Sequence, residues 1–582
     1  MIKVDNISYS FPQKDLYNKI SFTIEDGQHC AFIGVSGSGK STLIDLIMDP
    51  EKYMFDGNLE IEPDCTIGYV RQFYEVDKNN ELTVFEYIAE DFTNLQNELN
   101  KISEEMATSS SIELLLEKYQ KASDAFEALG GNNFESIINK KLNLSNLMHC
   151  KDLMISMVSG GEFKLIQVIK VMLTLPDLMI MDEPDVFLDF ENLNSLKKLI
   201  NSYKGTLIIV THNRYLLNHC FDKIIHLENM ELQEFNGKYI DYNFSLLQSK
   251  IEIQELAHAD TEEIKRNELI IDRFRDAAAI NAEASIGQHV NSRVKIQERL
   301  LARRIKAPFV NINQPNMVFP SNDVDYKNEE STVLKVSDFS ISFEDILLEN
   351  INFEIKSTDK VVIIGPNGTG KTTLLLEIAK NNHPSIKFRE ETKVAYLSQI
   401  KGETLNESNT VNEEFFDAGF KTYDEIKSCV INYGFDENIV NQKIGSLSGG
   451  EKNILQLAKF SYNNSDMLLL DEPTSHLDTY SQIALEKAIE NYNGAILMVS
   501  HDFYSIVNCM DYVLLIEDKT IRKMNMKKFK QMIYKNHFDK NYLEIEQKKK
   551  EIEIKIDLAL KDNNFELAKI IAEELESTIK LF

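Results

Sequence analysis

Two lysines stand in the same glycine-rich pattern, once in each half of the chain. Segment 34–41 reads GVSGSGKS and segment 365–372 reads GPNGTGKT. Each segment follows an apolar, β-rich run and precedes a helical pattern, so consecutive backbone N–H groups can curl around phosphate oxygens while the lysine neutralises their charge. We expect the phosphate-contacting residues to be Gly34, Ser36, Gly37, Gly39, Lys40, Ser41 and Thr42 in the first half, and Gly365, Asn367, Gly368, Gly370, Lys371, Thr372 and Thr373 in the second.

Further polar landmarks recur in the same order in both halves. The pairs are Gln72 and Gln399, Ser159-Gly160-Gly161 and Ser448-Gly449-Gly450, Asp182-Glu183 and Asp471-Glu472, and His212 and His501. From the serines to the histidines the offset between halves stays at 289, whereas the glutamines differ by 327, so the first half carries 38 extra residues between its glutamine and its serine. The chain is therefore a duplication with an insertion.

These residue types are the ones that hydrolysis of a nucleoside triphosphate needs: a held γ-phosphate, a metal, a positioned water and an acceptor for its proton. Asp182 and Asp471 end apolar strands and are expected to hold Mg²⁺ through water, with the hydroxyls of Ser41 and Thr372 as direct ligands. The acids that follow them, Glu183 and Glu472, are expected to polarise the attacking water. His212 and His501 are assigned to the γ-phosphate, and Gln72 and Gln399 to the metal and water shell. Phe11 and Phe343 occupy matching positions and either stack on adenine or pack in the core.

Outside the duplicated landmarks, apolar periodicity predicts three helical additions. Within about 92–130, two amphipathic patterns separated by Thr108-Ser109-Ser110-Ser111 indicate a helical arm hairpin. Residues 241–310 are expected to form a linker of two antiparallel helices with a tip near 279–287; ten basic residues against seven acidic ones make 262–306 net positive. A C-terminal extension over 523–582 is lysine-rich and either docks on RNA or is a solvated helical tail.

Composition limits the class of protein. The net charge of −29 argues against a general nucleic-acid binder, although a local basic surface remains compatible with it. No apolar run approaches the roughly 20 residues that a membrane-spanning helix needs. The six cysteines include no CxxC pair, and Cys220 and Cys509 keep the 289 offset of the duplication, so we expect reduced thiols and a cytoplasmic protein without a membrane partner.

The whole set of landmarks resembles the ATP-binding-cassette superfamily. This implies an α/β fold of two tandem P-loop NTPase domains, cassette one over 1–240 and cassette two over 311–522, with ATP and Mg²⁺ as ligands. It also implies that Ser448 closes over ATP at Lys40 and Ser159 over ATP at Lys371, in a head-to-tail sandwich within one monomeric chain. Cassette two has the usual sequence EPTSHLD after its strand, whereas cassette one has EPDVFLD, which leaves equal turnover at the two sites open.

A narrower resemblance is to the ABC-F family, whose members combine two cassettes, an arm and a linker of the form IxxFR…SRxKxxER. The matching residues are Ile271, Phe274, Arg275, Ser292, Arg293, Lys295, Glu298 and Arg299. The family implies a ribosome-binding ATPase that sits in the E site and extends its linker toward the peptidyl-transferase centre beside P-site tRNA. Arg275, Arg293, Lys295 and Arg299 are then the expected contacts to rRNA and tRNA.

Within this family, a resistance protein that dislodges antibiotics from the ribosome is favoured by the long linker and the added tail, and a housekeeping translation factor is the alternative. The ATP-binding subunit of a membrane transporter is a second class, and a DNA-repair or chromosome ATPase is a third. The arm and the basic linker speak against the transporter, and the lack of very long coiled coils or zinc cysteines inside a cassette speaks against the third class.

Overall fold

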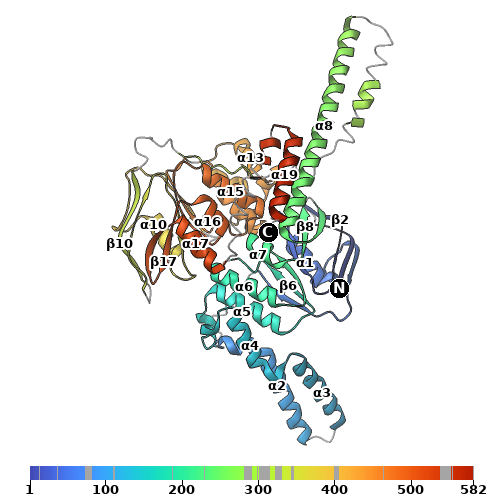
Figure 1. The fold of residues 1–582 in the computed structure, drawn as a ribbon, viewed down its shortest axis with the longest axis vertical. Helices are drawn as coiled ribbons and strands as arrows, with labels where there is room; N and C mark the ends of the chain where they lie inside the picture. Colours follow the sequence, from blue (N-terminus) through green and yellow to red (C-terminus); the bar gives the residue numbers. More distant parts are fainter. Residues whose placement is uncertain are drawn as a thin grey trace. The chain divides into compact units, whose positions relative to one another are not determined.

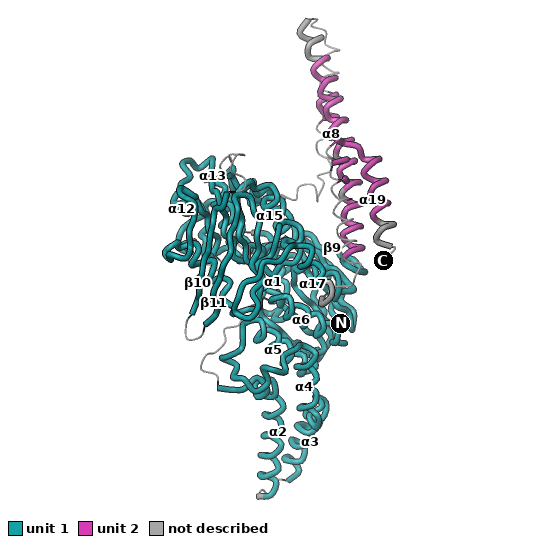
Figure 2. Tube along the Cα trace, turned by 60° about the vertical axis from the view of Figure 1, so that its left-hand side comes forward, with its two compact units in different colours: residues 1–239, 315–533 teal, residues 240–314, 534–582 magenta. Residues whose placement is uncertain are grey.

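The computed structural model describes most of the chain: residues 1–11, 14–35, 37–72, 81–108, 112–186, 188–228, 230–280, 292–297, 299–300, 315–321, 331–342, 346–398, 405–462, 464–537, 552, 555–556, 558–560 and 562–580. These residues form two compact units. Residues 1–239 and 315–533 make up unit 1, which contains both cassettes; residues 240–314 and 534–582 belong to unit 2 (Figure 2).

Each cassette is built on a six-stranded sheet. In cassette one the order is β5-β6-β7-β3-β8-β9, with only β9 antiparallel to its neighbour. The strands are β3 (His29–Ile33), β5 (Ile67–Val70), β6 (Leu178–Asp182), β7 (Thr206–Val210), β8 (Lys223–Glu228) and β9 (Glu231–Asn236). Because β6 and β7 are buried at every residue, they appear in the sequence as continuous apolar runs rather than alternating ones.

Cassette two repeats this sheet in the order β14-β15-β16-β12-β17-β18. Its strands are β12 (Lys360–Ile364), β14 (Val394–Leu397), β15 (Met467–Asp471), β16 (Ala495–Val499), β17 (Tyr512–Glu517) and β18 (Thr520–Asn525). The carboxyl ends of parallel strands meet at one edge of such a sheet, where ligands bind in open α/β folds. The glycine-rich loops, the Asp-Glu pairs and the histidines all follow these ends.

A three-stranded antiparallel sheet completes each cassette. The orders are β2-β1-β4 and β11-β10-β13. The strands are β1 (Ile2–Phe11), β2 (Lys14–Ile24), β4 (Asp56–Ile61), β10 (Thr332–Ser342), β11 (Ile346–Lys356) and β13 (Ile386–Phe388). Alternating side chains of β1, such as Ile2 and Val4, join the core of the larger sheet.

Helices cover the sheets (Figure 1). In cassette one they are α1 (Lys40–Met48), α4 (Phe134–Leu144), α5 (Gly160–Leu173), α6 (Phe190–Ser202) and α7 (Arg214–Cys220). In cassette two they are α10 (Lys371–Lys380), α12 (Val411–Asp417), α13 (Tyr423–Asn432), α14 (Gly449–Lys459), α15 (Thr479–Asn491), α16 (Phe503–Cys509) and α17 (Met526–His537).

The insertion of cassette one forms two helices, α2 (Val84–Thr108) and α3 (Ile112–Ala128), which lie side by side (Figures 1 and 2). Ile102, Leu115 and Ala122 are buried between them, with Leu99 and Met106 packed alongside. The break in the apolar pattern at 109–111 lies outside the described residues. The first helix begins at Val84, earlier than the boundary of about 92 that the pattern indicated. Its first turns, with Val84 and Ile88, are buried.

Unit 2 is helical and contains α8 (Tyr239–Ile280) and α19 (Phe565–Lys580). Residues 292–297 are helical and pack against α8: Asn267 Nδ2 donates to Gln297 Oε1 at 2.6 Å, and Gln297 Nε2 to Glu268 Oε1 at 3.0 Å. Ile264, Ile271 and Leu300 are buried in the same part. The expected tip near 279–287 lies mostly outside the described residues.

The C-terminal extension has structure that the sequence did not indicate. Residues 523–525 still belong to β18, so the sheet of cassette two runs past the boundary expected at 522. Farther on, α19 lies beside α8 (Figure 2). Ile556, Leu560, Ala568 and Leu575 form a buried cluster with Ile251 of α8, and Lys569 Nζ pairs with Glu255 at 2.6 Å. The described end of the chain is therefore a partner of the linker helix rather than a solvated tail.

No helix in the described parts of the chain combines the length and the apolar character that crossing a bilayer requires.

Candidate active site

Both glycine-rich loops adopt the strand–loop–helix conformation that their sequence predicts. Lys40 Nζ donates to the carbonyl oxygens of Gly34 at 2.8 Å and Val35 at 3.0 Å. Lys371 Nζ makes the equivalent contacts with Gly365 and Pro366, both at 2.8 Å. Each ammonium group therefore lies over its own loop at the start of a helix, where backbone N–H groups and the helix dipole favour an anion.

Glycine is required at two positions of the first loop. A Cβ atom at Gly34, whose φ is +153°, would lie 2.1 Å from the carbonyl oxygen of Leu227. Gly39 has φ +100° and a Cβ there would lie 2.9 Å from the hydroxyl of Tyr17, which donates to the Gly39 carbonyl at 2.5 Å. Any side chain would displace the backbone that faces the phosphates.

Each buried aspartate is held by the hydroxyl that follows the loop lysine. Ser41 hydrogen bonds Asp182, and Thr372 Oγ1 donates to Asp471 Oδ1 at 3.2 Å. Asp182 Oδ1 and Asp471 Oδ2 are buried without a hydrogen-bond partner in the described structure, and burial raises the pKa of both carboxyls to about 6. A carboxylate with an unsatisfied buried oxygen next to a hydroxyl fits a hard divalent cation such as Mg²⁺.

The two glutamates are placed alike by the backbone. The N–H of Glu183 donates to Val210 and that of Glu472 to Val499, each at 2.9 Å, and both residues have positive φ, 44° and 47°. A non-glycine residue in that region is uncommon and is concentrated at functional sites. His212 and His501 follow the neighbouring strands. Burial, followed by the charge of the loop lysine, lowers the pKa of His212 to about 4 and that of His501 to about 3, so both imidazoles are neutral.

The surroundings of the two glutamates differ. Burial raises the pKa of Glu183, but the hydrogen bond and charge of His476, and then the charges of His212 and Lys40, outweigh it and bring the pKa down to about 2. Burial and the neighbouring charge of Asp471 instead raise the pKa of Glu472.

Each glycine-rich loop faces the Ser-Gly-Gly segment, or signature segment, of the other cassette; these segments are 159–161 in cassette one and 448–450 in cassette two. A Cβ atom at Gly161 would lie 3.2 Å from Asn367 Nδ2 of the second loop, so the two segments approach each other closely. The N–H of Asn367 also donates to Asp189 Oδ2 at 3.3 Å. At the first loop, the charges of Asp478 and Glu451 from cassette two act on Lys40. Each of the two sites therefore combines residues of both cassettes.

The signature serines begin helices. Ser159 caps α5 and Ser448 caps α14, each in a capping box with the glutamate three residues later: Glu162 N and Glu451 N both donate to the serine hydroxyl at 3.3 Å. Gly160 and Gly449 are the first residues of these helices, followed by Gly161 and Gly450. The caps fix the helix N-termini that a phosphate would meet.

In the EPDVFLD segment of cassette one, Asp185 makes a hydrogen bond to the neighbouring strand end. Thr211 Oγ1, immediately before His212, donates to Asp185 Oδ1 at 2.6 Å. Burial raises the pKa of Asp185 to about 7. The acid that replaces the threonine of cassette two thus ties this loop to the segment carrying His212.

Several predicted site residues are placed only in part. Phe11 is 45% exposed at the end of β1, and its ring meets that of Tyr9 edge-on at 5.3 Å between centroids. Ser36, Phe343 and Gln399 lie outside the described residues. Gly37, Thr42, Gly368, Gly370 and Thr373 lie in the glycine-rich loops and in the first turns of the helices that follow them. Gln72 Nε2 contacts Glu183 Oε2, so this glutamine reaches the predicted water site.

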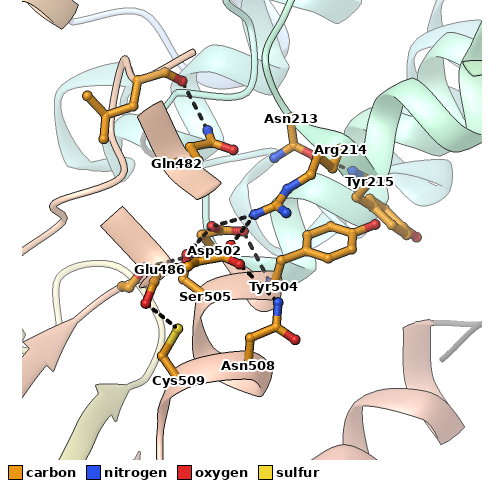
Figure 3. Close-up of polar contacts among 12 residues, drawn as sticks. Asn213, Arg214, Tyr215, Gln482, Glu486, Asp502, Tyr504, Ser505, Asn508 and Cys509 are labelled. Atoms are coloured by element: carbon orange, nitrogen blue, oxygen red, sulfur yellow. Dashed lines mark hydrogen bonds and ion pairs between the residues drawn. The ribbon is translucent and has the colours of Figure 1, made fainter. Parts of the chain in front are cut away.

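A buried ion network around Arg214, Glu486 and Asp502 joins the two cassettes (Figure 3). The guanidinium of Arg214, from cassette one, contacts Glu486, lies 3.7 Å from Asp502 Oδ2 and stacks over the ring of Tyr504 at 4.4 Å. Glu486 also accepts from Asn508 Nδ2 at 3.0 Å. Asp502 directly follows His501 and caps α16, so the network connects cassette one to that histidine's backbone.

The sequence reasoning did not assign roles to His476, Asp189, Lys164 or Arg214. Lys164 Nζ donates to the carbonyl of Gln72 at 2.9 Å and thereby holds that segment. Asp189 and Asp478 are related by the same 289 offset as the landmarks, which was an available signal. For Arg214 the duplication offered no such signal, because the residue at the corresponding position of cassette two is Phe503.

The predicted ribosome-contacting residues lie in unit 2. Lys295 and Arg299 are exposed, whereas Arg293 is half-buried, with NH1 3.5 Å from Asn267 Oδ1. The side chain of Arg275 is not among those described.

The comparisons with known proteins agree with this geometry. The family model described as ABC transporter matches residues 17–186 and 348–475, together about half of the chain. The ATP-binding protein YdiF of Bacillus subtilis is 28% identical over 90% of this chain and 81% of its own length. The energy-dependent translational throttle protein EttA of Escherichia coli is 28% identical over 87% of this chain and 90% of its own length. ABC transporter F family member 5 of Arabidopsis thaliana is 27% identical over 89% of this chain and 75% of its own length.

Among solved structures, the RNase-L Inhibitor matches with a TM-score of 0.52 over 92% of both chains, and an archaeal Pelota–ABCE1 model with 0.55 over 90% of this chain and 79% of the other, each at 16% identity. These likenesses confirm the fold of two tandem cassettes. The chain therefore belongs to the ABC transporter family of ATP-binding cassettes, as an ATP hydrolase with two cassettes in one polypeptide whose relatives over most of its length include ABC-F proteins.

Proposed function

We propose that the chain is a ribosome-binding ABC-F ATPase that acts in the E site, reaches the peptidyl-transferase centre with its linker, and protects the ribosome from antibiotics bound there. The observation that carries this proposal is the helical hairpin of unit 2. Its limbs are locked by the contacts between Asn267 and Gln297, and Lys295 and Arg299 are exposed on it. A net positive segment in a chain of charge −29 has the chemistry to bind RNA phosphates.

The composite sites would supply the energy for this activity. When bound, Mg²⁺ neutralises charge on the β- and γ-phosphates. Ser41 and Asp182 would hold it at one site, and Thr372 and Asp471 at the other. Glu183 and Glu472 would accept the proton of the attacking water, while the neutral His212 and His501 contact the γ-phosphate. Ser448 and Ser159 would close over the nucleotides at Lys40 and Lys371, so ATP binding joins the two cassettes.

A second candidate is a housekeeping translation factor without drug resistance. The relative named translational throttle protein favours it, since that name places the relative in translation and mentions no drug. Both candidates share the ribosome and the ATP cycle. They differ in what the linker does at the peptidyl-transferase centre.

The test of ribosome binding uses the variant Glu183→Gln with Glu472→Gln. Loss of the proton acceptors should leave ATP bound and unhydrolysed and trap the protein on ribosomes. In sucrose gradients with ATP we expect it in the ribosome fractions, and we expect the Lys40→Ala, Lys371→Ala protein at the top. A trapped variant that stays at the top of the gradient contradicts the proposal.

The test of drug protection is growth of a susceptible bacterium carrying the wild-type gene, on lincosamides, pleuromutilins and group A streptogramins. Protection against any of them, lost in the Glu183→Gln, Glu472→Gln variant, supports the first candidate. Ribosome trapping without protection against any of them supports the housekeeping factor.

A further inference from the structure

The catalytic glutamate of cassette one receives a hydrogen bond from the other cassette. His476 Nδ1 lies 3.1 Å from Glu183 Oε2, and Gln72 Nε2 contacts the same oxygen. The His476 side chain is 5% exposed and that of Glu183 is 16% exposed. Because a carboxylate oxygen accepts, His476 must carry a proton on Nδ1 and act as the donor.

His476 is held in an uncommon backbone conformation. Its φ is +60°, in the left-handed region that non-glycine residues rarely adopt. Such conformations persist where the surrounding structure imposes them, and they concentrate at functional sites. The imposed backbone aims a cassette-two imidazole at a cassette-one carboxylate.

Among the residues that the structure describes, no side chain of cassette one contacts Glu472 in this way. Glu472 is contacted by His501 of its own cassette, through the backbone N–H at 3.3 Å and Nε2 at 3.6 Å. By the 289 offset, the counterpart of His476 is Phe187, whose side chain has no hydrogen-bond donor. Another phenylalanine of cassette one, Phe190, packs edge-on against the His501 ring at 6.2 Å between centroids. The contact that the structure describes between cassette one and His501 is therefore an apolar ring, that of Phe190.

We propose that His476 is a positioning residue for the reaction at Lys40: it fixes Oε2 of Glu183 from across the cassette interface and leaves Oε1 to accept the proton of the attacking water. It follows that the site at Lys40 hydrolyses ATP faster than the site at Lys371. The inference rests on the role proposed above for Glu183.

The test isolates one live site at a time. Glu472→Gln leaves only the site at Lys40, and Glu183→Gln leaves only the site at Lys371. In single-turnover assays with radiolabelled ATP and Mg²⁺, we expect His476→Ala to slow the Glu472→Gln protein tenfold or more, because misplacing a catalytic group by about 1 Å can cost about 100-fold. The same change should alter the rate of the Glu183→Gln protein by less than twofold, and the ATP concentration for half-maximal rate should stay within twofold in both.

His476→Asn is the matched control, since its amide nitrogen can donate near the position of Nδ1. We expect it to restore the rate of the Glu472→Gln protein to within threefold. Equal slowing at both sites, or no slowing at the Lys40 site, would overturn the proposal. If Glu183→Gln itself fails to stop turnover at the Lys40 site, the role assigned to Glu183 is wrong, and that failure is distinct from a failure of His476.

Discussion

Removing Arg214 should weaken the association of the two cassettes. Its guanidinium reaches from cassette one to Glu486 and Asp502, and the side chains of Arg214 and Glu486 are only 14% and 5% exposed. Removal of one partner from a buried ion network costs about 3–5 kcal/mol, because the other charges stay buried without compensation. Each 1.4 kcal/mol corresponds to a tenfold change in an equilibrium constant. Arg214→Ala should therefore shift the equilibrium for cassette closure toward the open state by roughly 10²-fold to a few times 10³-fold.

The assay is the ATP concentration needed to close the cassettes in the Glu183→Gln, Glu472→Gln background, followed by hydrogen exchange of interface amides. Arg214→Ala should raise that concentration by at least tenfold. Arg214→Met combined with Glu486→Met should be less harmful than Arg214→Ala, because it removes one buried carboxylate and fills the space. A closing concentration for Arg214→Ala within twofold of its parent would refute the assignment of this network to the interface.

Three other changes have defined outcomes. Lys40→Ala with Lys371→Ala should abolish phosphate release, because each lysine supplies the positive charge that neutralises the nucleotide phosphates in its loop. Phosphate release above about a tenth of the wild-type rate would contradict the assigned sites. Ile556→Ala, at a side chain with no exposure, should destabilise the packing between the C-terminal region and α8 by about 2–5 kcal/mol, seen as faster hydrogen exchange in both segments and not in the cassettes. An aromatic disulfide reagent at pH 8 should react with Cys65 before any other thiol. Burial raises the pKa of Cys65 too, but this thiol is only partly covered, whereas the other five are buried and burial raises the pKa of Cys30, Cys150 and Cys220 to about 12; a second thiol that reacts as fast as Cys65 would contradict the described packing.

Much of the fold could be predicted because the same chemistry occurs twice in the sequence. The glycine-rich loops, the Asp-Glu pairs ending buried strands and the serine caps are short local patterns whose geometry follows from neighbouring residues. The arm was also local, since Leu99, Ile102 and Met106 already showed the helical period that packs them against α3.

Contacts between distant segments could not be predicted in this way. Arg214 and Glu486 lie 272 positions apart, and nothing near either residue indicates the other. The packing of Ile556 and Ala568 on Ile251 likewise depends on how the chain returns to α8, which no periodicity encodes. The EPDVFLD sequence of cassette one did indicate that the two sites differ. The contact between His476 and Glu183 could not be predicted, because these residues belong to different cassettes and lie 293 positions apart.

The account is tested most directly by a cryo-EM map of ribosomes incubated with ATP and the Glu183→Gln, Glu472→Gln protein. We predict the protein in the E site, with each nucleotide between the loop of one cassette and the signature serine of the other, and with the α8 hairpin directed toward the peptidyl-transferase centre. Ribosomes without the protein, or a bound protein whose hairpin points away from the ribosome, would contradict the account.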